Sequence, residues 1–480
     1  MTTASYRQSA DPGRVDSDLR ATLVGELAGE FAGELIGPDD AGYDSAREVW
    51  NAMVDKRPGL IARCTSTSDV VAIVKAAARH GLSPSVRCGG HNVAGKSLSE
   101  GGLTIDLGTM RGVVVDIANK LVHVDGGCRL GDVDAATGQH GLIVPAGIMS
   151  ETGVAGLALG GGIGWFSRKH GLTCDQFVEL EVVLASGEVV VASATEHPDL
   201  FWGLKGGGGN FGIVTRFTFQ GFDFGPMMRI GVSLYKPEDA VEALRQYASV
   251  YPTLGRNVGW HAALKHDMPV LPFVPPELVG ERLLMLISMW LEDAEDPAGI
   301  ELIDRLGTVG NPCVTASTVL PFGAGVQHII DEEFADGHRY YTKEAHVSQL
   351  SDEAIDVLYD FWKDMPMHGE VEIIGLGGAI EDIDEGAAAF SNRSYQMWLN
   401  FAMSWDDREN DADYIARTRA AVDLLKPWVG TGVYVNMLNF DEMDRVVEAY
   451  GAEKYARLAR VKTQYDPTNL FRINANILPG

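Results

Sequence analysis

Residues 87–97 read RCGGHNVAGKS and hold an imidazole, an ammonium group and a hydroxyl among glycines. Gly90 to Ser97 match GxxxxGKS, the pattern of a loop that binds nucleotide triphosphates through backbone amides, a lysine and a hydroxyl. That loop needs a strand before it and a helix after it. SPSVRC predicts the strand, but LSEGGLTIDLG, which follows Ser97, predicts a second strand and no helix. A P-loop nucleotide triphosphatase, with ATP or GTP held by Lys96, is therefore a distant alternative.

Two further glycine-rich stretches could bind phosphates in a similar way. GGGGNFG at 206–212 has the GxGxxG spacing of a dinucleotide-binding turn, whereas GGGIG at 160–164 lacks the third glycine. The residues after 212, IVTRFTF, alternate as a strand does, so the helix of that motif is missing. Three such loops within about 125 residues are an economical way to surround a long anionic cofactor with backbone amides. The simpler alternative is a set of tight turns in a strand-rich domain.

The segments around these loops predict the elements that position them. TSDVVAIVKAAARHGL has helical spacing, with Ser68 as its N-cap and Gly81 at its end. FVELEVVLASGEVVVAS predicts a hairpin that turns at Ser186 and Gly187. From about residue 228, helical patterns such as PEDAVEALRQYASVY alternate with strands such as RLLMLISMWLE and YQMWLNFAMSW. The second half is therefore predicted to be an α+β domain, a sheet backed by helices.

Composition narrows the class of protein. The 480-residue chain carries 66 acidic against 39 basic side chains, a formal charge of -27. Such a charge repels phosphate backbones and anionic membranes, so we expect neither nucleic acid nor a membrane as partner. The opening residues lack a signal-peptide core, and no run of about 18 apolar residues follows, which predicts a cytoplasmic protein. The five cysteines lack the close pairs of a zinc site, so we expect reduced thiols and no metal.

Four segments carry a family resemblance: RCGGHNVAGKS, PAGIMSETGVAGLALGGGIGWFSRKHGLTCDQ, DLFWGLKGGGGNFGIVTRFTF and the tail AYGAEKYARLARVKTQYDPTNLFRINANILPG. Together they resemble the berberine-bridge-enzyme-like oxidases, which share the FAD-binding fold of the vanillyl-alcohol-oxidase, or PCMH, type. The resemblance implies an α+β chain with a two-subdomain FAD-binding domain at 1–225, its core at about 56–225. It also implies a substrate domain with an antiparallel sheet at 226–438 and a C-terminal segment at 439–480 that returns to the first domain.

The resemblance also implies how FAD is held. His91 matches the histidine that the family joins to the 8α-methyl carbon of the flavin, a bond that a neutral imidazole nitrogen can form. Many members have a second link through a cysteine in GxCPxVG. The matching stretch here is GIMSETG, and the thioether of Met149 cannot form that link, so we expect a single covalent bond. The other residues that the matching motifs place around FAD are Arg87, Gly89, Gly90, Asn92, Val93, Ser97, Pro145, Gly147, Ser150, Thr152, Gly153, Gly156, Gly160, Gly162, Gly164, Gly212, Ile213, Val214, Asn436 and Asn474.

Removal of a hydride from a substrate needs a base near the departing proton. In the predicted strand HGEVEIIGLGGAI, His368, Glu370 and Glu372 share one face because strand side chains alternate with period two. A histidine and two carboxylates on one face are acid and base candidates. The alternative is a solvated strand at the edge of its sheet.

Two other family positions differ in this chain. By alignment on Trp405, Asn400 stands where the family has Glu or Gln over the flavin ring, and an asparagine can orient a substrate but cannot accept a proton. YVNML resembles the family's YxNY motif and keeps Tyr434 and Asn436, with Met437 in place of the second tyrosine. Either Tyr434 or the two glutamates must then act as base, or the substrate is acidic enough to need little help.

These departures bear on the substrate. The missing tyrosine disfavours simple sugars, and Met437, Met397 and Trp398 suggest an apolar or aromatic metabolite. The resemblance implies an oxidase, monomeric or homodimeric, that moves hydride from a carbinol or amine carbon to flavin and returns electrons to O2. Thr152 stands where plain oxidases have an aliphatic residue. Its hydroxyl could hydrogen-bond an oxygenated flavin, as in a bacterial polyketide-oxidising branch of oxygenases, or its methyl group could simply pack. A flavin carrier without catalysis is the remaining alternative.

Overall fold

A computed structural model describes residues 13–480, and its N-terminal part contains two large sheets and one two-stranded sheet. The first has four strands in the order β1-β2-β4-β3, of which β2, β4 and β3 are parallel. Val70, Ile73, Val74 and Ala77 recur at helical spacing and bury one side of α3 in the core that this sheet shares. The elements are β1 (Glu34–Ile36), β2 (Leu60–Arg63), β3 (Ser85–Arg87) and β4 (Leu103–Asp106), with α1 (Ser17–Leu27), α2 (Tyr43–Arg47) and α3 (Thr67–Arg79).

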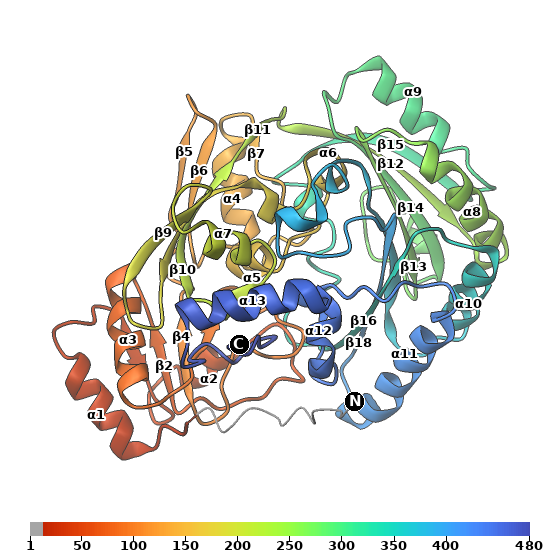
Figure 1. Ribbon diagram of the computed structural model, residues 1–480. Coiled ribbons are helices and arrows are strands. Elements are labelled where there is room, and N and C mark those ends of the chain that lie inside the picture. The colour runs from red at the N-terminus through yellow and green to blue at the C-terminus, as the bar shows by residue number, and fades with distance from the viewer. Residues whose placement is uncertain (1–12) are drawn as a thin grey trace.

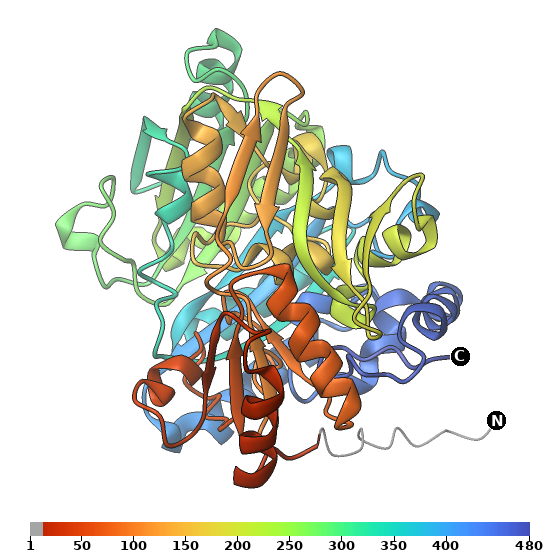
Figure 2. The same cartoon turned by 90° about the vertical axis from the view of Figure 1, so that its left-hand side faces the viewer.

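The second sheet is antiparallel and has five strands in the order β5-β6-β10-β8-β9. Figure 2 shows it, coloured orange to yellow-green, above the red and orange elements of the first sheet. Its elements are β5 (Val113–Asp116), β6 (Leu121–Asp125), β8 (Phe177–Val183), β9 (Val189–Ser193) and β10 (Ile213–Gln220). Around it lie α4 (Leu130–Gly138), α5 (Val154–Leu159), α6 (Ser167–His170), α7 (Pro198–Leu204) and the short pair β7 (Leu142–Ile143) and β11 (Phe222–Asp223).

A seven-stranded antiparallel sheet, in the order β15-β12-β14-β13-β17-β18-β16, forms the other half of the molecule. Four helices lie on its outer side, away from the first two sheets (Figure 1). The strands are β12 (Met227–Tyr235), β13 (Val258–Lys265), β14 (Leu283–Trp290), β15 (Val314–Pro321), β16 (Arg339–Val347), β17 (His368–Gly375) and β18 (Met397–Trp405). The helices are α8 (Pro237–Val250), α9 (Pro297–Leu306), α10 (Asp352–Lys363) and α11 (Asp411–Leu425).

Alternation along the strands decides what each face of this sheet carries. In β18, Leu399, Phe401 and Met403 join the core under the helices, while Trp398 and Asn400 point to the opposite side and line a cavity. β17 follows the same rule. Because the helices cover one face of the seven-stranded sheet, the opposite, inner face is directed toward the N-terminal sheets.

The C-terminal segment returns to the N-terminal part through α12 (Val446–Tyr450) and α13 (Ala452–Tyr465). The buried Lys462 Nζ donates to the carbonyl oxygens of Asn210 (2.6 Å) and Phe471 (2.9 Å) and to the Asp466 carboxylate (2.7 Å). These bonds connect the glycine-rich loop before β10 to the C-terminal tail. A buried ammonium group is stable only when acceptors surround it, and these three acceptors meet at Lys462 only when the tail packs against the loop.

Several expected elements are confirmed and two details are corrected. The hairpin forms as β8 and β9, with Gly187 at φ +79°, and strands follow both 88–97 and 206–212. The cap of α3 is Ser66 and not Ser68, because Ser66 Oγ accepts from the Asp69 amide at 3.2 Å. β17 lies between β13 and β18, so the alternative of a solvated edge strand is wrong.

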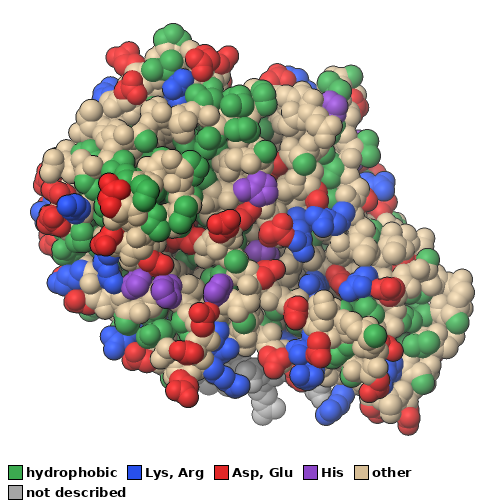
Figure 3. Space-filling model, turned by 180° about the vertical axis from the view of Figure 1, so that it is seen from behind, with side chains coloured by type: hydrophobic (Ala, Val, Ile, Leu, Met, Phe, Trp, Pro, Cys, Tyr) green, Lys and Arg blue, Asp and Glu red, His purple; other side chains and the backbone are tan. Residues whose placement is uncertain are grey.

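Surface charge is distributed without a large basic area on the face shown in Figure 3. Acidic side chains are scattered across that face, and basic ones lie beside them in small groups. Within residues 13–480, the helices are all too short or too polar to cross a bilayer.

Candidate active site

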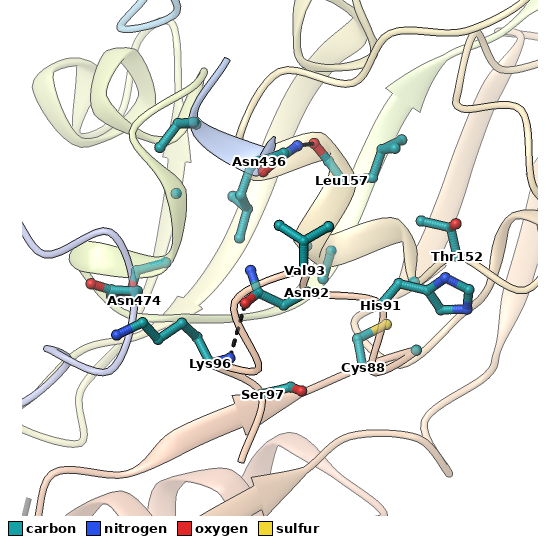
Figure 4. Close-up of a pocket in the computed structure, with 18 of the residues that line it drawn as sticks. Cys88, His91, Asn92, Val93, Lys96, Ser97, Thr152, Leu157, Asn436 and Asn474 are labelled. Atoms are coloured by element: carbon teal, nitrogen blue, oxygen red, sulfur yellow. Dashed lines mark hydrogen bonds between the residues drawn. The ribbon is translucent and has the colours of Figure 1, made fainter. Parts of the chain in front are cut away.

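A cavity of about 370 Å³ lies between the glycine-rich loops of the N-terminal part and the inner face of the seven-stranded sheet. Its size is within the usual range for ligand sites. The walls come from segments that are far apart in sequence: 88–97, 147–159, 207–214, strands β16 to β18, 434–437 and 471–475. Figure 4 shows His91 and Thr152 at one end of the view and Lys96 and Asn474 at the other.

The 88–97 loop approaches its neighbours through glycine. A Cβ on Gly89 would lie 2.5 Å from the Gly153 amide nitrogen, so the two loops pack backbone to backbone. Gly90 has φ +80°, a conformation that side chains disfavour. These two glycines allow the loop to turn so that His91 reaches the cavity.

His91 is held as a neutral imidazole. Its ring stacks on Trp50, with centroids 5.5 Å apart, and Trp50 stacks in turn on Tyr340 at 4.0 Å. Burial lowers the pKa of His91 to about 4, so the ring is unprotonated at neutral pH. An unprotonated ring nitrogen is the form that can bond to an electrophilic carbon.

Most of the residues predicted to surround the cofactor line this cavity, but six do not. Arg87 donates to the Ala46 carbonyl oxygen at 2.5 Å, and Ser150 Oγ contacts Asp331 at 2.5 Å. Gly160 and Gly162 pack against Asn436 and Thr173, where a Cβ would collide. The residues in the cavity wall are Gly89, Gly90, His91, Asn92, Val93, Ser97, Gly147, Thr152, Gly153, Gly156, Gly212, Ile213, Val214, Asn436 and Asn474; those outside it are Arg87, Pro145, Ser150, Gly160, Gly162 and Gly164.

The cavity wall suits a long ligand that has both flat and polar parts, and FAD is such a ligand. A Cβ on Gly156 or Gly209 would meet open space within 4 Å, so the backbone itself faces the cavity there. Ser97 Oγ and Asn474 Oδ1 are buried and have no hydrogen-bond partner among the residues that the structure describes. Such groups need a ligand that can bond to them. The residues present therefore fit FAD.

A carboxyl–amide pair faces the same cavity from the seven-stranded sheet. Glu372 on β17 is paired in register with Asn400 on β18, and Asn400 Nδ2 donates to Glu372 Oε2 at 2.6 Å. Burial raises the pKa of Glu372 to about 7, while the bond from Asn400 opposes that rise. Asn400 Oδ1 is buried and unpartnered among residues 13–480. The pair thus presents two free acceptors to a ligand.

Tyr434 lines the cavity but is held as a phenol. Its hydroxyl oxygen accepts from the Gly162 amide at 3.0 Å and from Asn436 Nδ2 at 2.9 Å. Burial raises the pKa of Tyr434 to about 12. At neutral pH this side chain is therefore a hydrogen-bond donor, whereas the pKa of Glu372, raised to about 7, leaves that carboxyl group partly ionised.

The other two members of the predicted acid–base face do not reach the cavity. Glu370 contacts the buried Lys265 Nζ at 2.5 Å, and Lys265 also pairs with Glu333 at 2.7 Å. His368 is 62% exposed and contacts Asp267 at 3.2 Å. The expectation that all three side chains converge is thus corrected. Glu370 is engaged by a lysine from β13, and His368 lies at the solvent end of the strand.

Two contributors to the site were missed by sequence reasoning. Trp50 stacks on His91, and Glu344 lies behind the cavity wall, where it accepts from the Tyr434 amide and from Trp398 Nε1, both at 2.9 Å. Burial raises the pKa of Glu344 to about 8. The alternation of polar and apolar residues in EAHV, which begins at Glu344, was a usable signal, whereas the surroundings of Trp50 carry no periodic pattern.

Comparison with known proteins agrees with this geometry. A family model described as FAD binding domain matches residues 58–193, and one described as berberine and berberine like matches residues 433–478. (R)-6-hydroxynicotine oxidase of Paenarthrobacter nicotinovorans is 30% identical over 467 residues, covering 93% of this chain and 96% of that protein. The structure of 6-hydroxy-D-nicotine oxidase from Arthrobacter nicotinovorans matches with a TM-score of 0.79 at 25% identity, over 94% of this chain and 98% of that one. Xylooligosaccharide oxidase from Myceliophthora thermophila C1, at 21% identity and a TM-score of 0.82 over 95% and 99% of the two chains, shares the fold.

The two family matches fall on the segments that build the cavity. The first contains the 88–97 and 147–159 walls, and the second contains Tyr434, Asn436 and the tail residue Asn474. FAD is accordingly the cofactor, and both matched segments contribute walls to the cavity. The full-length similarity, the fold and the cavity lead to one conclusion: this chain is an FAD-linked oxidoreductase that belongs to the berberine-bridge-enzyme-like oxidases.

Proposed function

We propose that the chain oxidises a carbinol or amine carbon of a small apolar or aromatic metabolite, with FAD joined covalently to His91 alone. One observation carries the proposal: Glu372, with its pKa raised to about 7, faces the same cavity as the neutral His91. A base close to the operating pH is the best compromise between being deprotonated and being basic. FAD, when bound, supplies the hydride acceptor and the route of electrons to O2.

Three groups of the chain have distinct roles in this scheme. Glu372 accepts the proton from the substrate's O–H or N–H, and the 2.6 Å bond from Asn400 Nδ2 fixes its orientation. Asn400 Oδ1 accepts a second hydrogen bond from the substrate. Tyr434, a phenol at neutral pH, donates to a substrate heteroatom. Two acceptors and one donor select a substrate with N–H or O–H groups over a carboxylate.

The rest of this wall is apolar and supports the proposed substrate class. Ile330, Phe334, Trp398, Ala402 and Met437 line the cavity around Glu372 and Asn400. An apolar wall excludes water and binds flat or aliphatic groups. The relative whose name specifies 6-hydroxynicotine, a molecule with an aromatic ring and an aliphatic amine, is in accord with this class.

A substrate panel tests the proposal. Purified protein is mixed without oxygen with benzylic alcohols, cyclic aryl amines and, for comparison, glucose and xylose oligomers, while the flavin's visible absorbance is followed. We expect amines or benzylic alcohols to bleach the flavin and the sugars to leave it oxidised. Bleaching by sugars alone would overturn the substrate class. A flavin that no compound bleaches, but that dithionite does, would favour a non-catalytic carrier.

Oxygen insertion into the substrate is the second candidate, because Thr152 lies in the cavity wall. The Thr152 amide donates to the Met149 carbonyl oxygen, and the Thr152 carbonyl oxygen accepts from the Leu130 amide. The Thr152 hydroxyl, in contrast, has no hydrogen-bond partner among residues 13–480. Thr152→Val keeps the shape and removes the hydroxyl. If the chain is an oxygenase, the variant should retain anaerobic flavin reduction within about threefold while oxygenated product disappears, as judged by mass spectrometry with labelled O2. Identical products from both proteins would remove this candidate.

A further inference from the structure

Lys96 enters the cofactor cavity without a partner. Its side chain extends along the cavity in the direction of Asn474 (Figure 4). Its backbone amide donates to Asn92 Oδ1 at 2.9 Å. Among residues 13–480, by contrast, nothing accepts a hydrogen bond from its ammonium group or forms an ion pair with it. Burial lowers the pKa of Lys96, the expected result for a cation that leaves water and meets no anion.

A second lysine beside it shows the contrast. Lys56 Nζ donates to the carbonyl oxygens of Gly95 at 2.6 Å and Leu98 at 3.2 Å, so its hydrogens are directed into the loop. Burial and then the charge of Lys96 lower the pKa of Lys56 to about 8. Two positive charges, those of Lys56 and Lys96, thus lie at this loop, and of these two lysines Lys96 lines the cavity. A cation held there without an anion costs free energy, so the fold is prepared for an anionic ligand.

Neighbouring groups indicate what kind of anion. Ser97 is 6% exposed, and its Oγ, next to Lys96 in sequence, has no hydrogen-bond partner among the described residues. The side-chain oxygen of Asn474 is also buried and has no hydrogen-bond partner among the described residues. The ligand must therefore offer negative charge together with further hydrogen-bonding atoms. At the opposite wall, Glu372 would repel such a group.

We propose that Lys96 pairs with the diphosphate of FAD. The diphosphate is the only anionic part of FAD, and an ammonium serves it as a point charge. This inference rests on FAD as the cofactor and is independent of the substrate. The lysine of the GKS sequence thus binds a phosphate group without the helix that a triphosphate loop requires.

Reversible flavin binding to full-length protein tests the proposal. His91→Ala removes the predicted covalent bond, and Lys96→Met and Lys96→Arg are added to it. Dissociation constants for FAD and for riboflavin, which lacks phosphate, are measured from the quenching of flavin fluorescence. We expect Lys96→Met to weaken FAD binding about 10- to 100-fold and to leave riboflavin binding unchanged. Lys96→Arg should recover most of the loss, and added salt should weaken FAD binding less in Lys96→Met than in the parent.

Other outcomes have definite meanings. Equal loss of FAD and riboflavin in Lys96→Met would make Lys96 a structural residue and overturn the proposal, as would unchanged FAD binding. Lys56→Met is the matched control, because Lys56 is bonded to loop carbonyls. It should weaken both flavins alike and lower the melting temperature. Retained affinity of Lys96→Met for riboflavin shows that the variant is folded.

Discussion

Glu372→Gln should slow flavin reduction by substrate about 100- to 10,000-fold while the flavin content stays that of the wild type. The amide keeps the shape of the side chain and can still accept the hydrogen bond from Asn400 Nδ2, which lies 2.6 Å from Glu372 Oε2 in the wild-type protein. It cannot accept a proton. The measurement is stopped-flow absorbance of the flavin without oxygen, over a range of substrate concentrations, so that kcat and KM effects separate. A loss smaller than about fivefold would mean that Glu372 is not the base.

The pH dependence of flavin reduction is a second test of whether Glu372 is the base. Burial raises the pKa of Glu372 to about 7, so the carboxylate form is gained as pH rises through that value. The rate of flavin reduction should therefore increase with pH below about 7 and level off above it. Glu372→Gln should lose this rise. Glu372→Asp, which retains a carboxylate on a shorter side chain, should keep the rise at a reduced rate.

The fold was predictable where a short-range pattern decides it. The period-two pattern of β17 and β18 set which residues face the helices, because hydrophobic side chains on alternate positions can be buried only on one side. The start of α3 was not predictable, since Ser66 and Ser68 both suit a cap. Asp69 decides it: its carboxylate accepts from the Ala32 and Thr65 amides at 2.7 and 2.8 Å, and its own amide donates to Ser66 Oγ.

The residues of the site likewise divide into those that a local sequence pattern predicts and those that it does not. His91 and the glycines beside it belong to a local motif, and the motif predicted that they lie together. Glu370 and Glu372 are equivalent in the strand pattern, yet one lines the cavity and the other does not. Glu370 pairs with the buried Lys265 of β13, and the same lysine also pairs with Glu333. Pairing between strands so distant in sequence has no local signature, so it becomes visible only in three dimensions.

His91→Ala should abolish covalent flavin completely. Protein denatured with acid and washed should keep its yellow colour in the pellet when His91 is present and release all of it into the supernatant when His91 is absent. The physical reason is that the pKa of His91, lowered to about 4 by burial, leaves an unprotonated nitrogen in the cavity at neutral pH. Met149, also in the cavity wall, offers no thiolate for a second bond.

Cys88 supplies the control for this result, because it is the one cysteine in the cavity wall within residues 13–480. Burial raises the pKa of its thiol to about 11, so the reactive thiolate is scarce at neutral pH. Cys88→Ser should therefore keep the coloured pellet. If colour survives in the His91→Ala pellet but disappears when Cys88→Ser is added, the link runs through sulfur. If wild-type protein releases its flavin, the cofactor is held by the cavity alone, and the binding contribution of Lys96 becomes measurable without a second mutation.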